Sequence, residues 1–210
     1  MLQEFVEAVQ KCVRKELQDV HTAIPGKIVS FDTKTGLATV LPTMKFKKPD
    51  GTTMDYPQIT GVPVLFQQGY GQKATVAFPV KAGDGCLIIV SEQSIDYWMY
   101  GQETETDLAF DLTDAICIPG LFVKANPVVK EACENNAVIL DVSGTRVSVQ
   151  KNNVEITSTT VKINGSLTVT GSVSAYGNVH AAGVSASGDV TAGSISLTGH
   201  THSGDGVTPS

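Results

Sequence analysis

The chain has few charged residues and no long apolar run, and each of these shortages excludes a class of protein. Charged residues make up 17% of the 210, the formal net charge is −6 and the pI is near 5.1. Proteins bind the phosphates of nucleic acid through a stripe of basic residues, and this acidic sequence has no such stripe. We therefore expect no nucleic-acid partner. No run approaches the roughly 20 apolar residues that span a bilayer. Charges interrupt residues 1–20, so we expect no signal peptide either.

Cysteines are also scarce, and none is close enough to another to form a CxxC pair. Zinc-site spacing is therefore absent, and the pattern favours folding in a reducing, cytoplasmic compartment. Three of the four lie in apolar patterns, so we expect them to be buried as small hydrophobic residues. The four are Cys12, Cys86, Cys117 and Cys133, of which the first three are those in apolar patterns.

Residues 2–20 have the spacing of an amphipathic helix, and we assign residues 1–24 to this N-terminal segment. Two interpretations are open. The helix packs on its own domain, or it pairs with copies of itself or with a neighbouring subunit. The apolar stripe consists of Leu2, Phe5, Val6, Val9, Val13, Leu17 and Val20.

From residue 25 to residue 120 the pattern changes to short strands separated by glycine turns. Asp32 to Gly36 is expected to be a hairpin turn with glycine in the left-handed conformation. Five or so strands in this space predict a small Greek-key barrel of the oligonucleotide/oligosaccharide-binding (OB) type. Its face lacks the aromatic and basic residues that bind nucleic acid, so a scaffold role is favoured. The expected strands are 26–31, 37–41, 59–66, 73–78 and 86–90.

Residues 94–100, with the sequence Ser-Ile-Asp-Tyr-Trp-Met-Tyr, contain the only tryptophan. We interpret them as an aromatic plug that closes one end of the barrel, with a ligand-stacking site as the alternative. Residues 121–136 are interpreted as a linker, because Pro127 and a polar run mark a boundary. Alternating strands joined by Ser143-Gly144 and by residues 151–153 follow, and they lead into a repeat.

The repeat is the most informative pattern in the chain. Residues 161–210 carry only three charges, Lys162, Asp189 and Asp205, and one aromatic, Tyr176. Glycines recur every five or six residues, with short β-branched pieces between them. A fixed short period predicts stacked repeats, each made of one strand and one corner. Such a repeat is too narrow to bury a core by itself. The glycines lie at 165, 171, 177, 183, 188, 193 and 199.

This order of segments resembles the central spike proteins of contractile phage tails. The resemblance rests on the helix, the Gly83-Asp-Gly85 strand, the aromatic segment, the stretch Asp114-Ala-Ile, and a repeat that ends in His200-Thr-His202. It implies a homotrimer in which three chains wind into a triple-stranded β-helix, with a shaft over 137–198 and an apex over 199–210. The expected fold class is therefore mainly β, with an N-terminal helix, an OB-type barrel and a trimeric β-helix spike.

The resemblance also implies that the apex holds one iron ion per trimer through the six histidines of three His-x-His motifs, here His200 and His202. The chemistry agrees with this ligand set. Alternate residues of a strand point to one face, so both imidazoles can face a threefold axis. Imidazole binds several transition metals, so the residues alone leave the metal open. A saturated shell of six nitrogens is structural, because it leaves no position for a substrate. The competing interpretation is an exposed, adventitious histidine pair.

The expected function is therefore mechanical: a structural spike at the tip of a baseplate, which pierces the bacterial envelope when the tail sheath contracts. Its expected partners are two further copies, baseplate hub and tail-tube proteins reached through the helix and barrel, and the envelope transiently. We expect assembly in the bacterial cytoplasm and a place in a virion or tail-like particle. The rival readings are a trimeric receptor-binding tail fibre or adhesin, and an enzyme. We expect no catalytic residues, because no HExxH, no nucleophile elbow and no paired carboxylates in a cleft-forming context occur.

Overall fold

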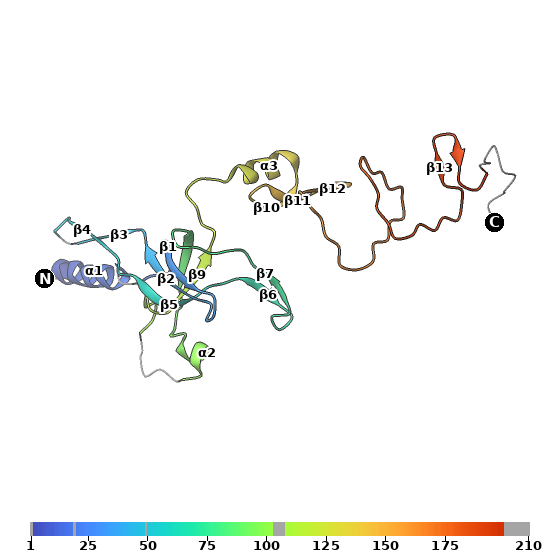
Figure 1. The fold of residues 1–210 in the computed structure, drawn as a ribbon. Helices are drawn as coiled ribbons and strands as arrows, with labels where there is room; N and C mark the ends of the chain where they lie inside the picture. Colours follow the sequence, from blue (N-terminus) through green and yellow to red (C-terminus); the bar gives the residue numbers. More distant parts are fainter. Residues whose placement is uncertain (1, 19, 49, 103–107, 200–210) are drawn as a thin grey trace. The chain divides into compact units, whose positions relative to one another are not determined.

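The computed structural model describes residues 2–18, 20–48, 50–102 and 108–199, and it divides the chain into two compact units, 1–157 and 158–210 (Figure 1). The first unit contains the helices α1 to α3 and the strands β1 to β12, and the second contains β13 and β14. The described protein is mainly β and begins with a helix, as the sequence predicts.

Helix α1, Leu2–Gln18, carries the predicted apolar stripe. Glu4 lies in its first turn and Lys15 in its last, where each charge is favourable in the field of the helix dipole. All seven stripe residues are exposed, from 41% at Val20 to 80% at Leu2. None of the described residues of this unit covers the stripe, so the packing of α1 on its own domain is not seen here. Pairing with another chain stays a prediction.

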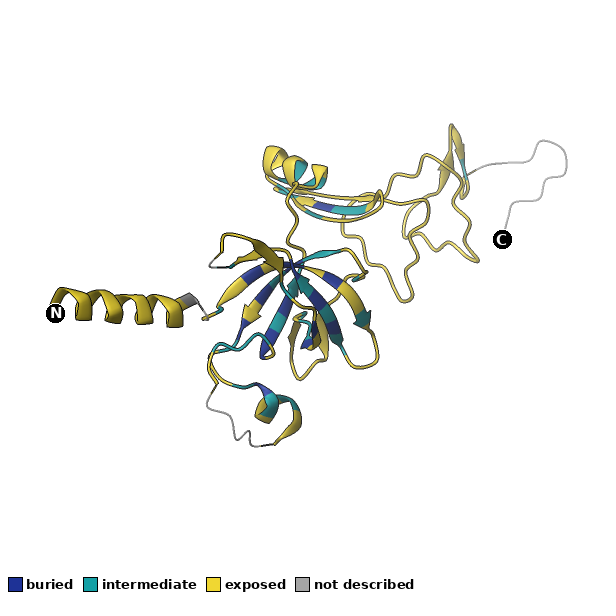
Figure 2. Ribbon diagram, turned by 90° about the vertical axis from the view of Figure 1, so that its left-hand side faces the viewer, coloured by how far each residue is buried: buried dark blue, intermediate teal, exposed yellow. Residues whose placement is uncertain are grey.

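Five strands form the central sheet of the first unit, in the order β5-β2-β1-β8-β9 with antiparallel neighbours. The sheet curls into a half-barrel, and its buried residues face the inside of the curl (Figure 2). The strands are β1 (Ala23–Asp32), β2 (Leu37–Pro42), β5 (Ile59–Pro63), β8 (Gly85–Val90) and β9 (Ala115–Pro119).

The first hairpin of this sheet forms as predicted, because Asp32 binds its own turn. The Asp32 carboxylate accepts hydrogen bonds from the Lys34 N–H (2.9 Å) and the Thr35 hydroxyl (3.0 Å). These two bonds lower the pKa of Asp32, since they favour its charged form. Gly36 follows with φ of 74°, the left-handed conformation that closes the turn without a steric penalty.

The core lies inside the curled sheet and is built by period-two alternation along the strands. Residues that face inward are almost fully buried, while their neighbours in sequence remain partly or fully exposed. Phe31, Val64, Val80 and Leu112 pack against this core from its margin. The buried members are Ile28, Ala38, Val40, Ile59, Val62, Cys86, Ile88, Ala115 and Cys117.

The cysteine predictions hold for two of the three residues. Cys86 and Cys117 lie on β8 and β9 and are fully buried, as expected. The Cys117 thiol donates a hydrogen bond to the neighbouring sulfur of Cys86, and this bond, together with burial, raises the pKa of Cys117. Cys12 is exposed on α1, so the prediction that it is buried is wrong. Its apolar neighbours on the helix find no core within this unit.

The two outer strands of the sheet approach each other, which is what makes the sheet barrel-like. Val64, just after β5, forms a parallel bridge with Cys117 of β9. The Leu65 N–H donates to the Cys117 carbonyl at 2.8 Å, and the Val64 N–H donates to the Gly36 carbonyl at 3.1 Å. These bonds satisfy backbone groups that would otherwise be left open at the sheet edge.

Two hairpins project from the sheet (Figure 1). One joins β3 (Lys45–Lys47) to β4 (Thr53–Asp55), and Lys45 forms an ion pair with Asp55 across it. The other joins β6 (Gln67–Gly69) to β7 (Ala74–Val76). Every residue of these four strands is exposed, so the hairpins are held by backbone pairing and contribute little to the core.

The prediction of an aromatic plug is wrong. Residues Asp96–Tyr100 form the short helix α2, whose aromatic side chains point to solvent: Tyr97, Trp98 and Tyr100 are 65%, 71% and 58% exposed. The inward residue is aliphatic Ile95, whose N–H donates to the buried Asp114 carboxylate at 3.0 Å. An aliphatic residue and a carboxylate therefore anchor this segment and leave the rings outside.

The segment 121–136, predicted as a linker, contains helix α3, Pro127–Asn135. Asn126 is its N-cap and accepts a hydrogen bond from the Val128 N–H at 2.9 Å, and Pro127 occupies the first turn. Asn136 ends the helix in the left-handed conformation. An Asn-Pro start and an asparagine stop are ordinary helix signals, which the linker interpretation overlooked.

Three antiparallel strands follow α3 and form a meander in the order β10-β11-β12, as the alternation predicts. They are β10 (Val138–Val142), β11 (Thr145–Gln150) and β12 (Asn153–Thr157). The first turn is Ser143-Gly144, with φ of 53° and 93° at the two residues, and the second includes Asn152 with φ of 63°. Positive φ at both central residues matches the right-handed twist of the strands.

The second unit has little regular structure in its described part, residues 158–199. Its only strands there are the two-residue pair β13 (Thr191–Ala192) and β14 (Ile195–Ser196). Of the seven glycines in the repeat, only Gly165 and Gly193 adopt positive φ, 148° and 63°, so glycine corners are seen at two of the seven predicted positions. Nearly every side chain of residues 158–199 is exposed, which is the condition expected of a repeat too narrow to bury its own core.

Replacing Gly85 by alanine tests how tightly the barrel closes on the segment after β9. A Cβ at Gly85 would lie 1.9 Å from the Leu121 carbonyl oxygen, a backbone atom that cannot rotate away. We expect Gly85→Ala to lower the free energy of unfolding by about 1–3 kcal/mol, measured by urea denaturation. Gly69→Ala is the control, since its Cβ would meet nothing within 4 Å. Equal stability of the two variants would contradict this packing.

Candidate assembly interface and apex

The sheet β10–β12 presents an uncovered apolar face made of two cross-strand rows. The first row is Val138–Val149–Val154 and the second is Leu140–Val147–Ile156. We call these six residues the apolar ladder. Five of them are exposed, including Leu140 at 67% and Val138 at 70%. Alternation places all six on one face, because directly paired residues in neighbouring strands point the same way.

The opposite face of the same sheet is mostly polar, with Ile139 as its apolar residue, and α3 packs on it. Arg146 of β11 binds the Glu131 carboxylate of α3 at 2.9 Å, and its Nε lies 3.7 Å from an Asp141 carboxylate oxygen. The bond to Glu131, assisted by the charges of Glu131 and Asp141, raises the pKa of the Arg146 guanidinium. Ser148 on this face is buried. Helix α3 therefore covers the polar face and leaves the apolar ladder free.

Leaving this ladder in water is costly. Full burial of a valine, leucine or isoleucine side chain contributes about 1.5–3 kcal/mol, so six such residues represent roughly 10 kcal/mol per chain. A contiguous exposed apolar face of this kind marks an interaction surface in a soluble protein. The ladder is therefore the strongest candidate in the described protein for an interface with other chains.

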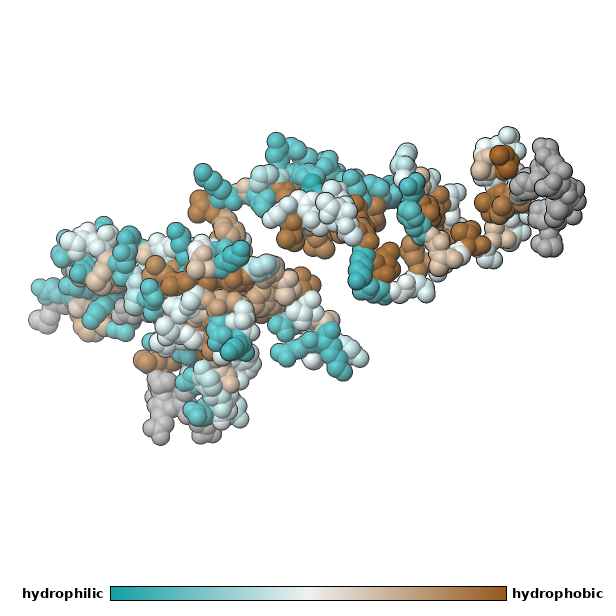
Figure 3. Space-filling model, in the orientation of Figure 1, coloured by the Kyte–Doolittle hydropathy of each residue, from teal (hydrophilic) through white to brown (hydrophobic). Residues whose placement is uncertain are grey.

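The same situation continues along the second unit. Its β-branched and leucine residues are exposed at intervals that follow the glycine repeat, and apolar side chains are spread along the described segment (Figure 3). Lys162 and Asp189 are the only charged residues described in it. The exposed apolar residues are Val161, Ile163, Leu167, Val169, Val173, Val179, Val184, Val190, Ile195 and Leu197.

Asp189 organises the last described turns. Its carboxylate accepts hydrogen bonds from the Thr198 hydroxyl at 2.9 Å and the Thr198 N–H at 3.2 Å. Hydrogen bonds from Ser196 and Thr198 lower the pKa of Asp189. The Gly199 N–H donates to the Ser196 hydroxyl at 2.8 Å. The chain thus arrives at the predicted metal-binding motif from an ordered hairpin.

The predicted metal ligands His200 and His202 lie outside the described residues. Among residues 2–199, apart from the short undescribed gaps, no three histidine, cysteine or acidic side chains gather as a metal site. The other two histidines belong to neither candidate surface. His21 packs edge-on against Tyr56, with ring centroids 5.6 Å apart, and His180 is exposed in the second unit.

Two features of this site were missed from the sequence. One is α3, whose start is signalled by Asn126-Pro127. The other is Arg146, which the sequence does not distinguish from the other polar residues of an alternating strand. No local pattern identifies its partner Glu131, 15 residues away, because the pair forms only when the helix folds onto the sheet. None of the described helices combines the length and apolarity needed to cross a bilayer.

Comparison with protein families gives a match for the part of the chain that contains the curled sheet. Residues 24–120 match the family model described as the phage protein Gp138 N-terminal domain. The matched segment contains the curled sheet from β1 to β9 except for the first residue of β1, Ala23. No curated protein matches the chain. The family match supports a tail-related structural protein of a phage, and with it a place in the virion.

Replacing Arg146 by alanine tests whether α3 is fastened to the sheet through this side chain. We expect Arg146→Ala to lower the thermal unfolding midpoint, because it leaves the carboxylates of Glu131 and Asp141 without their shared cation. Lys130→Ala removes a solvent-exposed pair with Glu134 on the same helix and should leave the midpoint nearly unchanged. If the two variants melt together, α3 is held by other contacts.

Proposed function

We propose that this chain is the central spike of a contractile phage tail or a related injection machine, and that it acts as a homotrimer. In this role it pierces the bacterial outer envelope when the tail sheath contracts. The observation that carries the proposal is the uncovered apolar ladder, followed without interruption in the chain by a charge-poor glycine repeat. Both need other chains to be buried, and three copies wound about one axis can cover both with the same contacts.

Threefold symmetry suits the ladder because each chain supplies one flat apolar face. Three such faces close a triangular prism whose interior is apolar and whose outer faces are polar. Helix α3, fastened by Arg146 and Glu131, then lies on the outside. In such a prism every strand is paired or covered, so no lateral sheet edge is left to fray under load.

The curled sheet supports the OB-type barrel expected at the base of the spike. Counted along the chain, its five strands stand in the order third, second, first, fourth and fifth. The parallel bridge between Val64 and Cys117 then brings the third strand beside the fifth, as in a five-stranded Greek-key barrel. We assign this barrel, with the exposed stripe of α1, to the contacts with the baseplate hub and the tail tube.

The role we propose is mechanical and needs no chemistry on a substrate. The force comes from sheath contraction, and the shaft transmits it to a narrow tip that touches the envelope transiently. Residues 158–199 carry few charges, which reduces the desolvation cost of pushing them through lipid. The spike would reside at the tip of the baseplate in the assembled particle.

At the apex, we propose that His200 and His202 of three chains hold one iron ion. The donor set fits such an ion, since neutral imidazole is a good ligand for iron as well as for nickel, copper and zinc. When bound, the ion would join three C-terminal segments into one point that would otherwise fray. The Asp189 hairpin, through Thr198, holds the residues that lead into this motif.

Disrupting the apolar ladder tests the trimer. We expect native mass spectrometry of the unmodified chain to give three times 22.1 kDa. Leu140→Lys places a charge on the ladder and should give the mass of one chain, because burying three lysines near one axis is strongly unfavourable. Val123→Lys is the control, since Val123 is fully exposed and lies off the ladder. A monomeric unmodified chain would overturn the proposal.

Removing the two histidines tests the apex separately. The double variant His200→Ala/His202→Ala should keep the trimer mass and lose the metal, because the ladder and the repeat are intact. Native mass and elemental analysis of the same sample measure both properties. A trimer that carries no metal before mutation would contradict the iron apex and leave the spike assignment standing.

A further inference from the structure

A groove of about 740 Å³ lies on the first unit, between the β1–β2 turn, the segment after β5, the β6–β7 hairpin and α2. Its volume is in the range of small-molecule sites, about 300–1,000 Å³. The assembly interface described above uses none of its residues. Its lining consists of glycines, aliphatic and aromatic residues, a threonine and two glutamines, and it contains no ionisable side chain.

One wall of the groove is preorganised by the closure of the sheet. Val64 and Leu65 line it, and both have their N–H groups bound to carbonyls within the barrel, at 3.1 and 2.8 Å. Phe66 continues the wall and packs against Phe31 and Phe78, with ring centroids 6.1 and 5.7 Å apart. The wall therefore needs no rearrangement before a ligand binds, which lowers the entropic cost of binding.

Trp98 of α2 also lines the groove. Helix α2 is anchored beneath it by the Ile95 N–H, which donates to the buried Asp114 carboxylate, and is closed by Gly101 in the left-handed conformation. Trp98 itself is 71% exposed and has no aromatic ring partner among the described residues. A large ring held on a rigid support and left in water is available for stacking.

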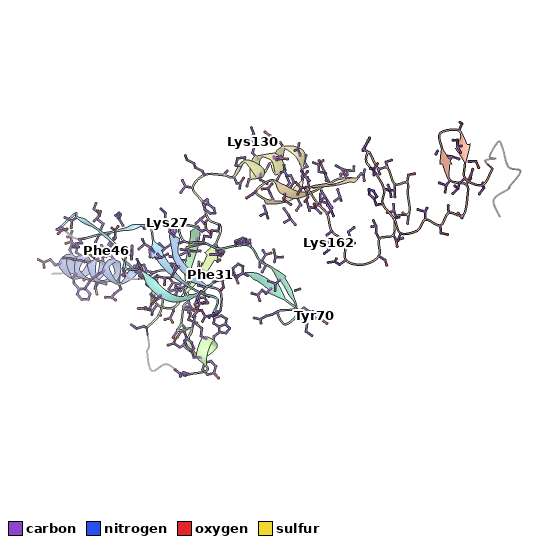
Figure 4. All side chains as sticks on the ribbon, viewed as in Figure 1. Lys27, Phe31, Phe46, Tyr70, Lys130 and Lys162 are labelled. Atoms are coloured by element: carbon purple, nitrogen blue, oxygen red, sulfur yellow. The ribbon has the colours of Figure 1, made fainter. Side chains whose placement is uncertain are left out.

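The remaining polar groups come from the β6–β7 hairpin. Tyr70 lies at its tip (Figure 4), which is bent by three successive residues with positive φ, Tyr70, Gly71 and Gln72. The Lys73 ammonium lies over the Tyr70 ring. Gln72, with Gln68 of β6, lines the groove. In the described part of the chain neither side-chain amide has a protein hydrogen-bond partner, so each can donate to and accept from a ligand.

We propose that this groove binds a neutral oligosaccharide. An aromatic face beside free amides matches the two surfaces of a sugar ring, since the C–H face stacks on Trp98 and the hydroxyls bond to Gln68 and Gln72. The uncharged lining provides no partner for phosphate, carboxylate or a metal ion. An extended peptide would add to a free strand edge, yet the N–H groups of Val64 and Leu65 are already used.

The test uses Trp98 as its own reporter, because it is the only tryptophan in the chain. The full-length assembled protein is titrated with neutral trisaccharides, chitotriose and maltotriose among them, and tryptophan emission is recorded. A sulfated trisaccharide is the charged comparison. We expect a saturable change with at least one neutral sugar and none with the charged one. Calorimetry on Trp98→Ala should show that binding is lost.

Variants of the amides decide whether the emission change arises in the groove. Gln68→Ala and Gln72→Ala each remove one hydrogen bond and should weaken binding roughly threefold to tenfold. Tyr97→Ala is the control, since Tyr97 is exposed on the same helix but does not line the groove. The proposal is overturned if no neutral sugar gives a saturable response, or if the glutamine variants bind like the unmodified chain. It is equally overturned if acrylamide fails to quench Trp98 in the assembled protein, because another chain then covers the groove.

Discussion

An apolar sheet face that the described residues of its own unit leave exposed is the constraint on which the rest of this structure depends. The ladder on β10–β12 has α3 on its other side, and Arg146 fixes that choice by binding Glu131 and Asp141. Because α3 packs on the polar face, the apolar ladder is the face of this sheet that is available to other chains. The glycine repeat that follows also exposes its apolar residues, because its short segments form no second layer that could cover them.

The two parts of the chain therefore solve the problem of burial differently. The curled sheet is wide enough to bury residues such as Ile28, Val40 and Ile88 within one chain, and its outer strands meet through Val64 and Cys117. Residues 158–199, in contrast, expose nearly every side chain and bury no core among their own described residues. A folded curled sheet followed by an exposed apolar segment suits a structural protein of a phage particle, which the family match of residues 24–120 supports.

Most of the successful predictions rested on the alternation of apolar and polar residues along strands and on the residues typical of turns. The hairpin at Asp32–Gly36 and the meander of β10–β12 were predictable because each depends on contacts between residues close in sequence. The errors share a different cause. Cys12 and the rings of α2 were assigned to a core by their apolar character alone, although an apolar residue is buried only where another element covers it. Helix α3 was overlooked beside a proline that in fact begins it.

The sequence by itself determined the period of the glycine repeat, its lack of charge, the positions of the turns and the face on which each strand is apolar. These properties follow from local geometry, because side chains alternate along a strand and glycine permits positive φ. The tertiary structure alone decided that Trp98 faces a groove with Gln68 and Gln72, and that Arg146 holds α3 against the sheet. Those contacts join residues far apart in the chain, and only the folding of the backbone brings their side chains within reach.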